Sequence, residues 1–271
     1  MFSLRVVCGR GCPPAGGCAT LRAFVERSRM LFLTGLNLYF ILFLVIALAP
    51  AIYLMVYVYR LDPIDKEPVG LLWSLILVGV AAALIAGLLE AVGMQVFGLF
   101  SGLDPNSVQF TVASDFLVVG LVEEGVKYVF MGRRTWRARA FNCRFDGVVY
   151  AVFTSLGFAA AENVMYGLTY GTGVLFARAF MAIPAHMGFA VLFGMFYGQG
   201  KLLAVRGHGF LSKGFIVVGY LLSVGLHGLY DSTAMVQTES SMGAFFVVVL
   251  AIYLINFVIA RSAARHDRRF A

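Results

Sequence analysis

Charged side chains are scarce in this chain. Asp, Glu, Lys and Arg together make up 13% of its 271 residues, about half the share that is typical of a soluble domain. Hydrophobic residues make up 61% and form long continuous runs, whereas a membrane β-barrel would show short alternating strands. The net charge is +7, but the chain has no soluble basic face, which excludes nucleic acid as a partner. The composition predicts an all-α, polytopic transmembrane helix bundle in a lipid bilayer.

Cysteine is also sparse, and most of it lies in one place. Three of the four cysteines fall within the first 18 residues, and the fourth is Cys143. None has metal-finger spacing with partner histidines, so neither a zinc finger nor a disulfide framework is expected. Residues 1–30 also lack the apolar core of a signal peptide. We expect them to be a disordered tail, or to precede a true translation start near Met30.

Long apolar segments follow this tail, and each can form a tilted transmembrane span. Residues 31–262 are therefore predicted to form a single helical domain, followed by a basic cytoplasmic tail at residues 263–271. About seven spans are expected, and an eighth, poorly marked span is an alternative. The seven cover residues 38–59, 70–100, 110–131, 147–168, 174–197, 214–236 and 243–260.

Lysine and arginine gather in three connecting regions, which sets the expected orientation. They follow the third, fifth and seventh spans, whereas the loops after the second, fourth and sixth spans carry almost none. By the positive-inside rule, the basic loops and the C-terminus lie in the cytoplasm. Seven spans would then place the N-terminus outside. The arginines of residues 22–29 conflict with that placement, unless translation starts near Met30 or an eighth span exists.

Two adjacent carboxylates interrupt the third span, which has Asp115 near its entry. Glu123 and Glu124 stand among apolar residues, and Lys127 follows one turn later. One charged side chain at the bilayer centre costs about 2.5 to 3.5 kcal/mol on insertion scales, so such residues normally face a bundle interior or a wet cavity. On a helix Glu123 and Lys127 nearly eclipse, while Glu124 points about 100° away. One glutamate can pair with Lys127 while the other serves as a general acid or base.

The fourth and fifth spans carry further polar side chains. Three alanines before Glu162 and Asn163 let helix backbones approach closely, which forces Glu162 into the interior or a cavity. Pro184 kinks the fifth span next to His186, where an imidazole can act as a base, a donor or a metal ligand. Arg178 lies two turns earlier on a similar face.

The sixth span adds His227 and Asp231, which share a helical face at the spacing of a metal site or of an aspartate that orients a histidine. Each polar set alone has a structural explanation, such as an ion pair or a hydrogen-bonded interior histidine. Glu90 in the second span is interpreted in that way, as structural or interfacial. Because the polar sets on four spans fall at similar depth, however, they predict a water-filled polar cavity.

Taken in order, these motifs resemble the PrsW family of intramembrane proteases, over about residues 45–235. The motifs that carry the resemblance are Ala49-Pro-Ala-Ile-Tyr53, Tyr59-Arg-Leu-Asp-Pro-Ile-Asp-Lys-Glu-Pro68, Glu123-Glu-Gly-Val-Lys-Tyr128, Phe145-Asp-Gly-Val-Val-Tyr150, Phe158-Ala-Ala-Ala-Glu-Asn163, Arg178-Ala-Phe, Pro184 with His186, and His227-Gly-Leu-Tyr-Asp231.

The resemblance implies an intramembrane endopeptidase of the bacterial plasma membrane. Its expected substrate is a single-pass membrane protein, as in the founding member's first, extracytoplasmic cut of an anti-sigma factor. The CAAX-prenyl proteases of the same superfamily carry Arg and His where this chain has Lys127 and Glu162, which favours the PrsW branch. The family pattern places catalytic residues at Glu123, Glu124, Glu162, His186 and His227.

We expect water to be the nucleophile and Glu123 the base, with Lys127 setting the charge of the glutamate pair. His227, oriented by Asp231, would hold the water or stabilise the oxyanion. His186 with Asn163 would supply further donors, and Glu162 would orient His186 or Arg178. The sequence departs from the His-Glu-x-x-His signature of zincins, so no cofactor is favoured. If zinc binds, the expected ligands are His186, His227, Glu162 and Asp231.

Two functions of other classes use the same residues. A proton- or ion-coupled transporter could use the buried carboxylates as a relay, although the internal repeats typical of transporters are absent from the sequence. A catalytically silent scaffold could bind other membrane helices through the same bundle. Cleavage of a membrane protein would separate a protease from both.

Overall fold

The structure, a computed structural model, describes residues 16–236 and 238–270. The chain divides into two compact units, residues 1–45 and residues 46–271. Helix α1 (Gly16–Leu61) supplies residues to both. Residues 16–30 were expected to belong to a disordered tail, but they form the start of this helix. They contain good helix formers such as Ala, Leu and Arg and no proline. The rest of that expected tail lies outside the described residues, and a start near Met30 stays a prediction.

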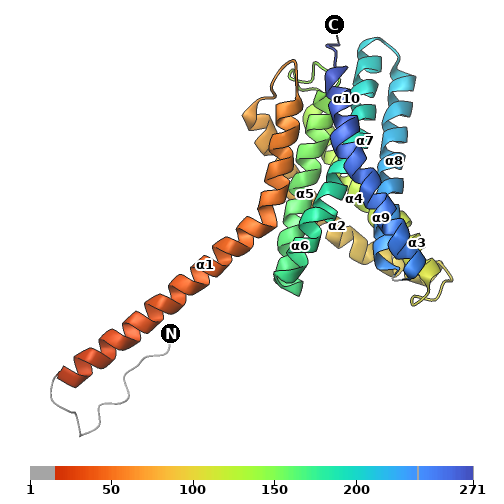
Figure 1. Cartoon of the computed structure of the whole chain (residues 1–271). Coiled ribbons are helices and arrows are strands. Elements are labelled where there is room, and N and C mark those ends of the chain that lie inside the picture. Colours follow the sequence, from red (N-terminus) through yellow and green to blue (C-terminus); the bar gives the residue numbers. More distant parts are fainter. Residues whose placement is uncertain (1–15, 237, 271) are drawn as a thin grey trace. The chain divides into compact units, whose positions relative to one another are not determined.

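Residues 46–271 form an all-α bundle, as the composition predicted, and the described residues contain no β-strand (Figure 1). Six helical stretches of the described chain are long and apolar enough to cross a membrane. They are Glu26–Leu61 within α1, α2 (Val69–Phe100), α5 (Asp146–Tyr170), α6 (Gly173–Phe180) with α7 (Ala182–Val205), α8 (Gly209–Met235), and α9 (Glu239–Leu254) with η2 (Ile255–Ile259) and α10 (Ala260–Arg265).

The helix that carries the acidic pair, expected at residues 110–131, differs from these six because of its charges. It consists of α3 (Val108–Ser114), a π-helical turn η1 (Asp115–Gly120) and α4 (Leu121–Thr135). A π-turn adds a residue to the helical repeat, so it rotates α4 relative to α3 and is a frequent feature of functional sites. The rotated α4 buries both of its glutamates and Lys127 inside the bundle.

The fifth expected span is broken where Pro184 predicted a distortion. Helix α6 ends at Phe180, and α7 begins at Ala182. Since Pro184 has no N–H, the Phe180 carbonyl loses its helical partner, and the Tyr253 hydroxyl donates to that oxygen at 2.7 Å. The Asn256 amide donates to the Pro184 carbonyl, also at 2.7 Å. The last long helix therefore satisfies the polar groups exposed by the break.

Glycines let α5 and α7 approach until their backbones touch. A Cβ atom on Gly194 would overlap the backbone of Val148, and one on Gly198 would overlap the carbonyl oxygen of Arg144. A Cβ atom on Gly147 of α5 would likewise overlap the backbone of Gly194 and Gly198 in α7. Small residues at such contacts are the usual means by which membrane helices pack closely. The approach of α5 to α7 brings Glu162 and His186 into reach of each other.

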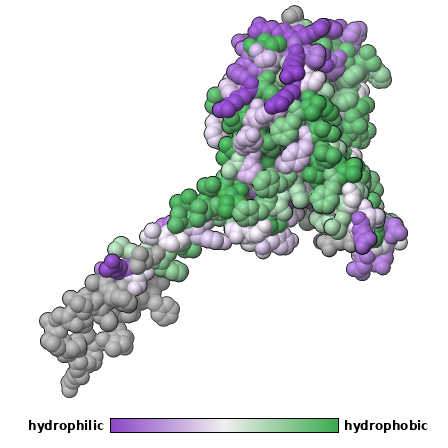
Figure 2. Space-filling view, in the orientation of Figure 1, coloured by the Kyte–Doolittle hydropathy of each residue, from purple (hydrophilic) through white to green (hydrophobic). Residues whose placement is uncertain are grey.

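The basic loops meet at one end of the second unit, which we call the basic end. Lys201 near the end of α7 donates to the Trp136 carbonyl after α4 at 2.6 Å, and the Phe270 N–H donates to the Asn142 carbonyl at 2.9 Å. Figure 2 shows hydrophilic surface gathered at this end of the unit and apolar surface along its sides. The charge pattern expected from the sequence is therefore also a spatial one.

Buried carboxyl groups lie beneath the basic end. Glu67, in the loop between α1 and α2, is only 4% exposed, and the Tyr150 hydroxyl donates to its Oε2 at 2.9 Å. The two backbone N–H groups of Asn142 and Cys143 donate to Asp146 Oδ2. Burial, reinforced by the nearby Asp146 carboxylate, raises the pKa of Glu67 from 4.5 to about 8.

Gly198→Ala should lower the thermal stability of the protein in detergent, because the added Cβ has only backbone to displace. Overpacking of this kind costs about 1–3 kcal/mol. Gly214→Ala on α8 is the matched control, since open space surrounds that glycine and alanine is the better helix former. Equal melting temperatures for the two variants would contradict the close α5–α7 contact.

Glu67→Gln should flatten the pH dependence of thermal stability. Between pH 4.5 and about 8 the folded protein holds a proton on Glu67 that the unfolded chain releases, so the free energy of unfolding falls as the pH rises through this window. Glutamine never ionises, so the variant should melt above the wild type at pH 8 and close to it at pH 5. Melting curves followed by circular dichroism across this range test the prediction; parallel curves would refute it.

Candidate active site

Three ionic side chains of α4 meet in the interior of the bundle. Lys127 Nζ lies 2.5 Å from Glu124 Oε1 and 3.4 Å from Glu123 Oε2, and it stands 4.3 Å from the centre of the Phe158 ring. Lys127 and Glu124 are fully buried. The shorter contact joins residues three apart rather than the nearly eclipsed pair four apart, because His227 also holds Glu124 Oε1.

Helix α5 supplies the third carboxylate, Glu162. Its Oε2 lies 2.8 Å from His186 Nε2 and 3.3 Å from Arg178 Nη2, so Glu162 contacts both of the residues that it was expected to orient. The other ring nitrogen of His186, Nδ1, lies 3.4 Å from Lys127 Nζ. His186 therefore joins the ammonium of α4 to the carboxylate of α5.

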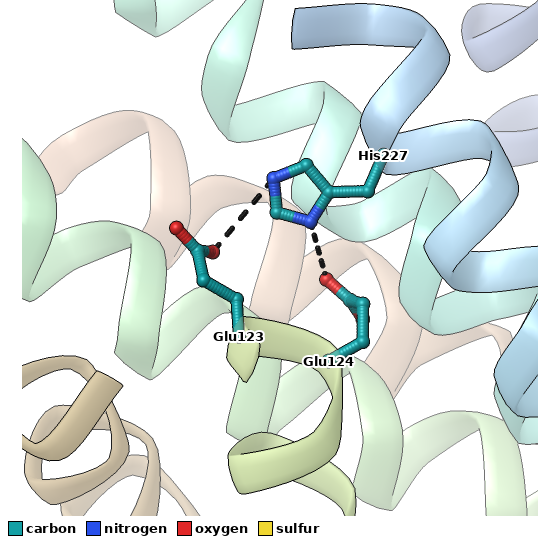
Figure 3. Close-up of side chains that lie close together, drawn as sticks. All are labelled: Glu123, Glu124 and His227. Atoms are coloured by element: carbon teal, nitrogen blue, oxygen red, sulfur yellow. Dashed lines mark hydrogen bonds and ion pairs between the residues drawn. The ribbon is translucent and has the colours of Figure 1, made fainter. Parts of the chain in front are cut away.

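His227 on α8 contacts both members of the acidic pair (Figure 3). Its Nδ1 lies 2.8 Å from Glu124 Oε1 and its Nε2 lies 3.8 Å from Glu123 Oε2. Nε2 also lies 3.1 Å from Asp231 Oδ2, one turn along the same helix. The ring stacks on Phe189 of α7 with 4.6 Å between the ring centres. Stacking on Phe189 and contacts at both ring nitrogens thus fix the imidazole.

These groups line a cavity of about 490 Å³. The two glutamates of α4 differ here, because Glu123 lines the cavity and Glu124 does not. The helical wheel separated the two side chains but could not show which one faces the cavity. The other predicted site residues that line it are Glu162, Arg178, His186, His227 and Asp231.

Asn163, expected to supply a donor beside His186, lies behind the cavity wall instead. It is fully buried, and its amide nitrogen donates to the Ala47 carbonyl at 2.8 Å. Its Oδ1 accepts from Arg178 Nε at 3.0 Å, while the Arg178 guanidinium lies 4.0 Å from the centre of the Tyr166 ring. Asn163 therefore positions Arg178 and does not face the cavity.

Two carboxylates that sequence reasoning set aside also line the cavity. Glu90 was interpreted as structural or interfacial and Asp115 as the entry of the third span, yet both face the polar space. One buried oxygen of each, Glu90 Oε1 and Asp115 Oδ2, has no hydrogen-bond partner among the described residues. A single acidic residue in an apolar helix was the sequence signal that could have identified them. The sequence alone does not show how each helix is rotated, and so whether the acid faces the cavity.

The donor set is suited to a divalent metal. Two compact groups of ligand atoms occur among the described residues, Glu123 with Glu124 and His227, and Glu123 with Glu162 and His186. Imidazoles and carboxylates are ordinary zinc ligands. Three of these carboxylates face only two fixed cations, Lys127 and Arg178, which leaves a negative charge for a proton or a metal to balance. The zinc ligands expected from the sequence included Asp231 but not Glu123, whereas Glu123 belongs to both of these groups.

The ring nitrogens of the two histidines test this fit further. An ammonium has no lone pair, so His186 Nδ1 accepts from Lys127 and His186 Nε2 is left to donate to Glu162. Both nitrogens of His227 face carboxylate oxygens. That ring must donate at both positions or give one to a metal cation. A metal cation beside His227 Nε2, Glu123 and Asp231 would resolve this conflict, so the donor set fits a metal ion.

Comparison with known proteins finds one protein family over most of the chain. The family description "PrsW family intramembrane metalloprotease" matches residues 67–259, well over half of the chain. "Protease PrsW" of Clostridioides difficile is 28% identical over 230 residues, 83% of this chain and 92% of its own length. "Protease PrsW" of Shouchella clausii is 30% identical over 185 residues, which are 68% of this chain and 80% of the relative.

"Protease PrsW" of Bacillus subtilis is 26% identical over 210 residues, or 76% of this chain and 88% of the relative. No solved structure matches the chain. The sequence favoured no cofactor, whereas the matching family is described as metalloproteases.

Proposed function

This chain belongs to the PrsW family of intramembrane metalloproteases, and from that premise we propose that Glu123 activates water to hydrolyse a peptide bond in a single-pass membrane protein. The chain is a membrane peptidase, as its relatives are. The observation that carries the proposal is the cavity in which Glu123, Glu162, His186 and His227 face one another inside the membrane bundle.

Glu123 is placed for the role of general base. It is the member of the acidic pair that lines the cavity, and its Oε2 keeps only long contacts of 3.4 Å to Lys127 and 3.8 Å to His227. A carboxylate held loosely in a wet cavity can take a proton from water and return it to the leaving amine. Glu124, by contrast, is committed to short contacts with Lys127 and His227.

Donors for the developing oxyanion surround the same space. Arg178 carries a fixed positive charge, and Glu162 and Asn163 orient its guanidinium. His227, oriented by Asp231 and Glu124, lies across from Glu123. Donors that are fixed before the reaction stabilise the charge of a tetrahedral intermediate without further rearrangement. Lys127 and Glu124 act through their neighbours, by setting the charge and the positions of His186 and His227.

A zinc ion would be held by Glu123 with His186 and Glu162, or by Glu123 with His227 and Glu124. When bound, such an ion supplies Lewis-acid polarisation of the scissile carbonyl and a lower pKa for water. The chain's own residues still orient the substrate, exclude bulk water and carry the proton between water and the leaving group.

The position of the cavity supports a cut away from the basic end. Its lining includes Asp231 and Met235 at the end of α8 and Arg178 in α6, whereas the basic loops join the opposite ends of these helices. If the basic end is cytoplasmic, as the positive-inside rule predicts, cleavage takes place toward the outer side of a bacterial plasma membrane. An anti-sigma-factor-like protein with one span is the substrate class that fits.

Glu123→Gln should lower kcat for cleavage of a co-reconstituted single-pass substrate by about 100-fold or more, the usual contribution of a general base. Glu124→Gln should lower kcat less, by about 10-fold, because it disturbs His227 without removing the base. Glu239→Gln, exposed at the start of α9, is the matched control. The new N-terminus of the product is followed by mass spectrometry; full activity in both site variants would refute the mechanism.

Metal dependence is tested by zinc content as well as by activity. Purified protein should retain zinc measured by elemental mass spectrometry, and 1,10-phenanthroline should remove both the metal and cleavage. His227→Ala should lower the zinc content at unchanged protein yield, whereas His208→Ala in the exposed α7–α8 loop should not. Cleavage that persists in metal-free protein would favour a glutamate-only mechanism.

A further inference from the structure

A second cavity, of about 550 Å³, opens at the basic end and shares no lining residue with the active-site cavity. It lies between the start of α5, the second half of α7, α8 and the segment from η2 to α10. Its walls are mostly apolar side chains, among them Phe145, Val148, Met195, Phe196, Phe215 and Val258. Nothing in the proposed protease mechanism uses this space.

The cavity exists because α8 and the last helix meet only near their other ends. Tyr230 of α8 contacts Phe245 of α9 with 5.5 Å between the ring centres, and Leu226 packs against Val248 and Ile252 in the same cluster. Toward the basic end, Phe215 of α8 and Ala263 of α10 line the cavity instead. Two of its lining side chains, Phe215 and Val258, are exposed, so the cavity opens sideways, toward the apolar surface expected to face the membrane.

The polar side chains of the cavity include a cation with an unused donor. Arg144 Nε is buried and has no hydrogen-bond partner among the described residues. The Asp267 carboxylate lies close enough to interact electrostatically with Arg144, but its Oδ1 accepts from the Phe145 N–H at 2.9 Å. By contrast, the interior cations Lys127 and Arg178 both form ion pairs with carboxylates. A buried guanidinium N–H without an acceptor lacks a strong hydrogen bond, so an external acceptor such as a phosphate oxygen is its natural complement.

Three neighbouring groups extend this polar site. Gln199, Ser262 and His266 line the same cavity as Arg144. His266 Nδ1 lies 2.8 Å from the Ser262 carbonyl oxygen, which fixes its ring and leaves Nε2 without a partner among the described contacts. A guanidinium with hydroxyl and amide donors is suited to the oxygens of a phosphate group.

A second apolar groove, of about 290 Å³, adjoins the first. It shares Phe196 and Phe215 with the larger cavity, and these two rings contact each other at 5.9 Å between centres. Its remaining lining is Phe210, Leu211, Gly214 and Val218 of α8, and Phe210 is 90% exposed. Two apolar grooves separated by one aromatic wall therefore lie beside one phosphate-suited group of side chains.

We propose that this cavity binds an anionic phospholipid of the leaflet at the basic end. The phosphate and its headgroup contact Arg144 and His266, one acyl chain enters the larger cavity, and the second lies along the groove next to Phe210. A basic pocket between membrane helices, open sideways and apolar below, is the arrangement expected for such a headgroup. A peptide would need backbone hydrogen-bond partners along the groove, and the grooves have apolar walls.

Native mass spectrometry of the full chain tests the proposal. The protein is released from micelles that contain equal amounts of phosphatidylglycerol and phosphatidylcholine with identical acyl chains. Wild type should retain phosphatidylglycerol preferentially. Arg144→Gln should lower that preference about fivefold, the value of one basic side chain near an anionic headgroup. Arg144→Lys should keep part of it, since lysine retains the charge but not the planar fork.

Two controls make the test specific. Arg206→Gln removes an exposed charge of the basic end outside the cavity and should keep the full preference. Ala263→Trp fills the apolar part and should lose both lipids while keeping cleavage and its melting temperature in detergent. An unchanged preference in Arg144→Gln, or an equal loss in Arg206→Gln, would overturn the proposal. So would a rise in melting temperature with inorganic phosphate alone that equals the rise with phosphatidylglycerol.

Discussion

The buried ammonium of Lys127 is the constraint on which the site depends. A charge with no exposure to solvent is tolerated only where partners surround it, and the partners here come from three helices: Glu123 and Glu124 on α4, His186 on α7 and the ring of Phe158 on α5. Breaking any of these contacts would leave an uncompensated charge. The ammonium therefore fixes α4, α5 and α7 relative to one another.

Glu124 extends the same network to a fourth helix. Its Oε1 accepts from Lys127 and faces His227 Nδ1, so α8 is joined to α4 through a single oxygen. This division of labour is what leaves Glu123 facing the cavity with long contacts only. In the proposed mechanism the two adjacent glutamates are therefore not redundant: Glu124 holds the structure of the site, and Glu123 acts on the water.

Much of this architecture could be predicted from the sequence, and the failures have specific physical causes. Apolar length placed the spans, and the cost of charge in hydrocarbon identified Glu123, Glu162, His186 and His227. Helical spacing showed that one glutamate can pair with Lys127 but not which one. The lysine lies nearer to Glu124 because His227, distant in sequence, holds that carboxylate. Glu90 and Asp115 were set aside because their direction depends on how α2 and the π-turn are rotated, which no short-range pattern records.

The two histidines are not equivalent, and this difference bears on where a metal would bind in the proposed site. His186 lies between a donor, Lys127, and an acceptor, Glu162, so one neutral tautomer satisfies both of its nitrogens. His227 lies between two carboxylates, and no neutral tautomer can satisfy both. Excess negative charge is therefore greatest at His227 Nε2, beside Glu123 and Asp231. A cation in the cavity gains most at that nitrogen, which leaves Lys127, His186 and Glu162 to keep the helices in place.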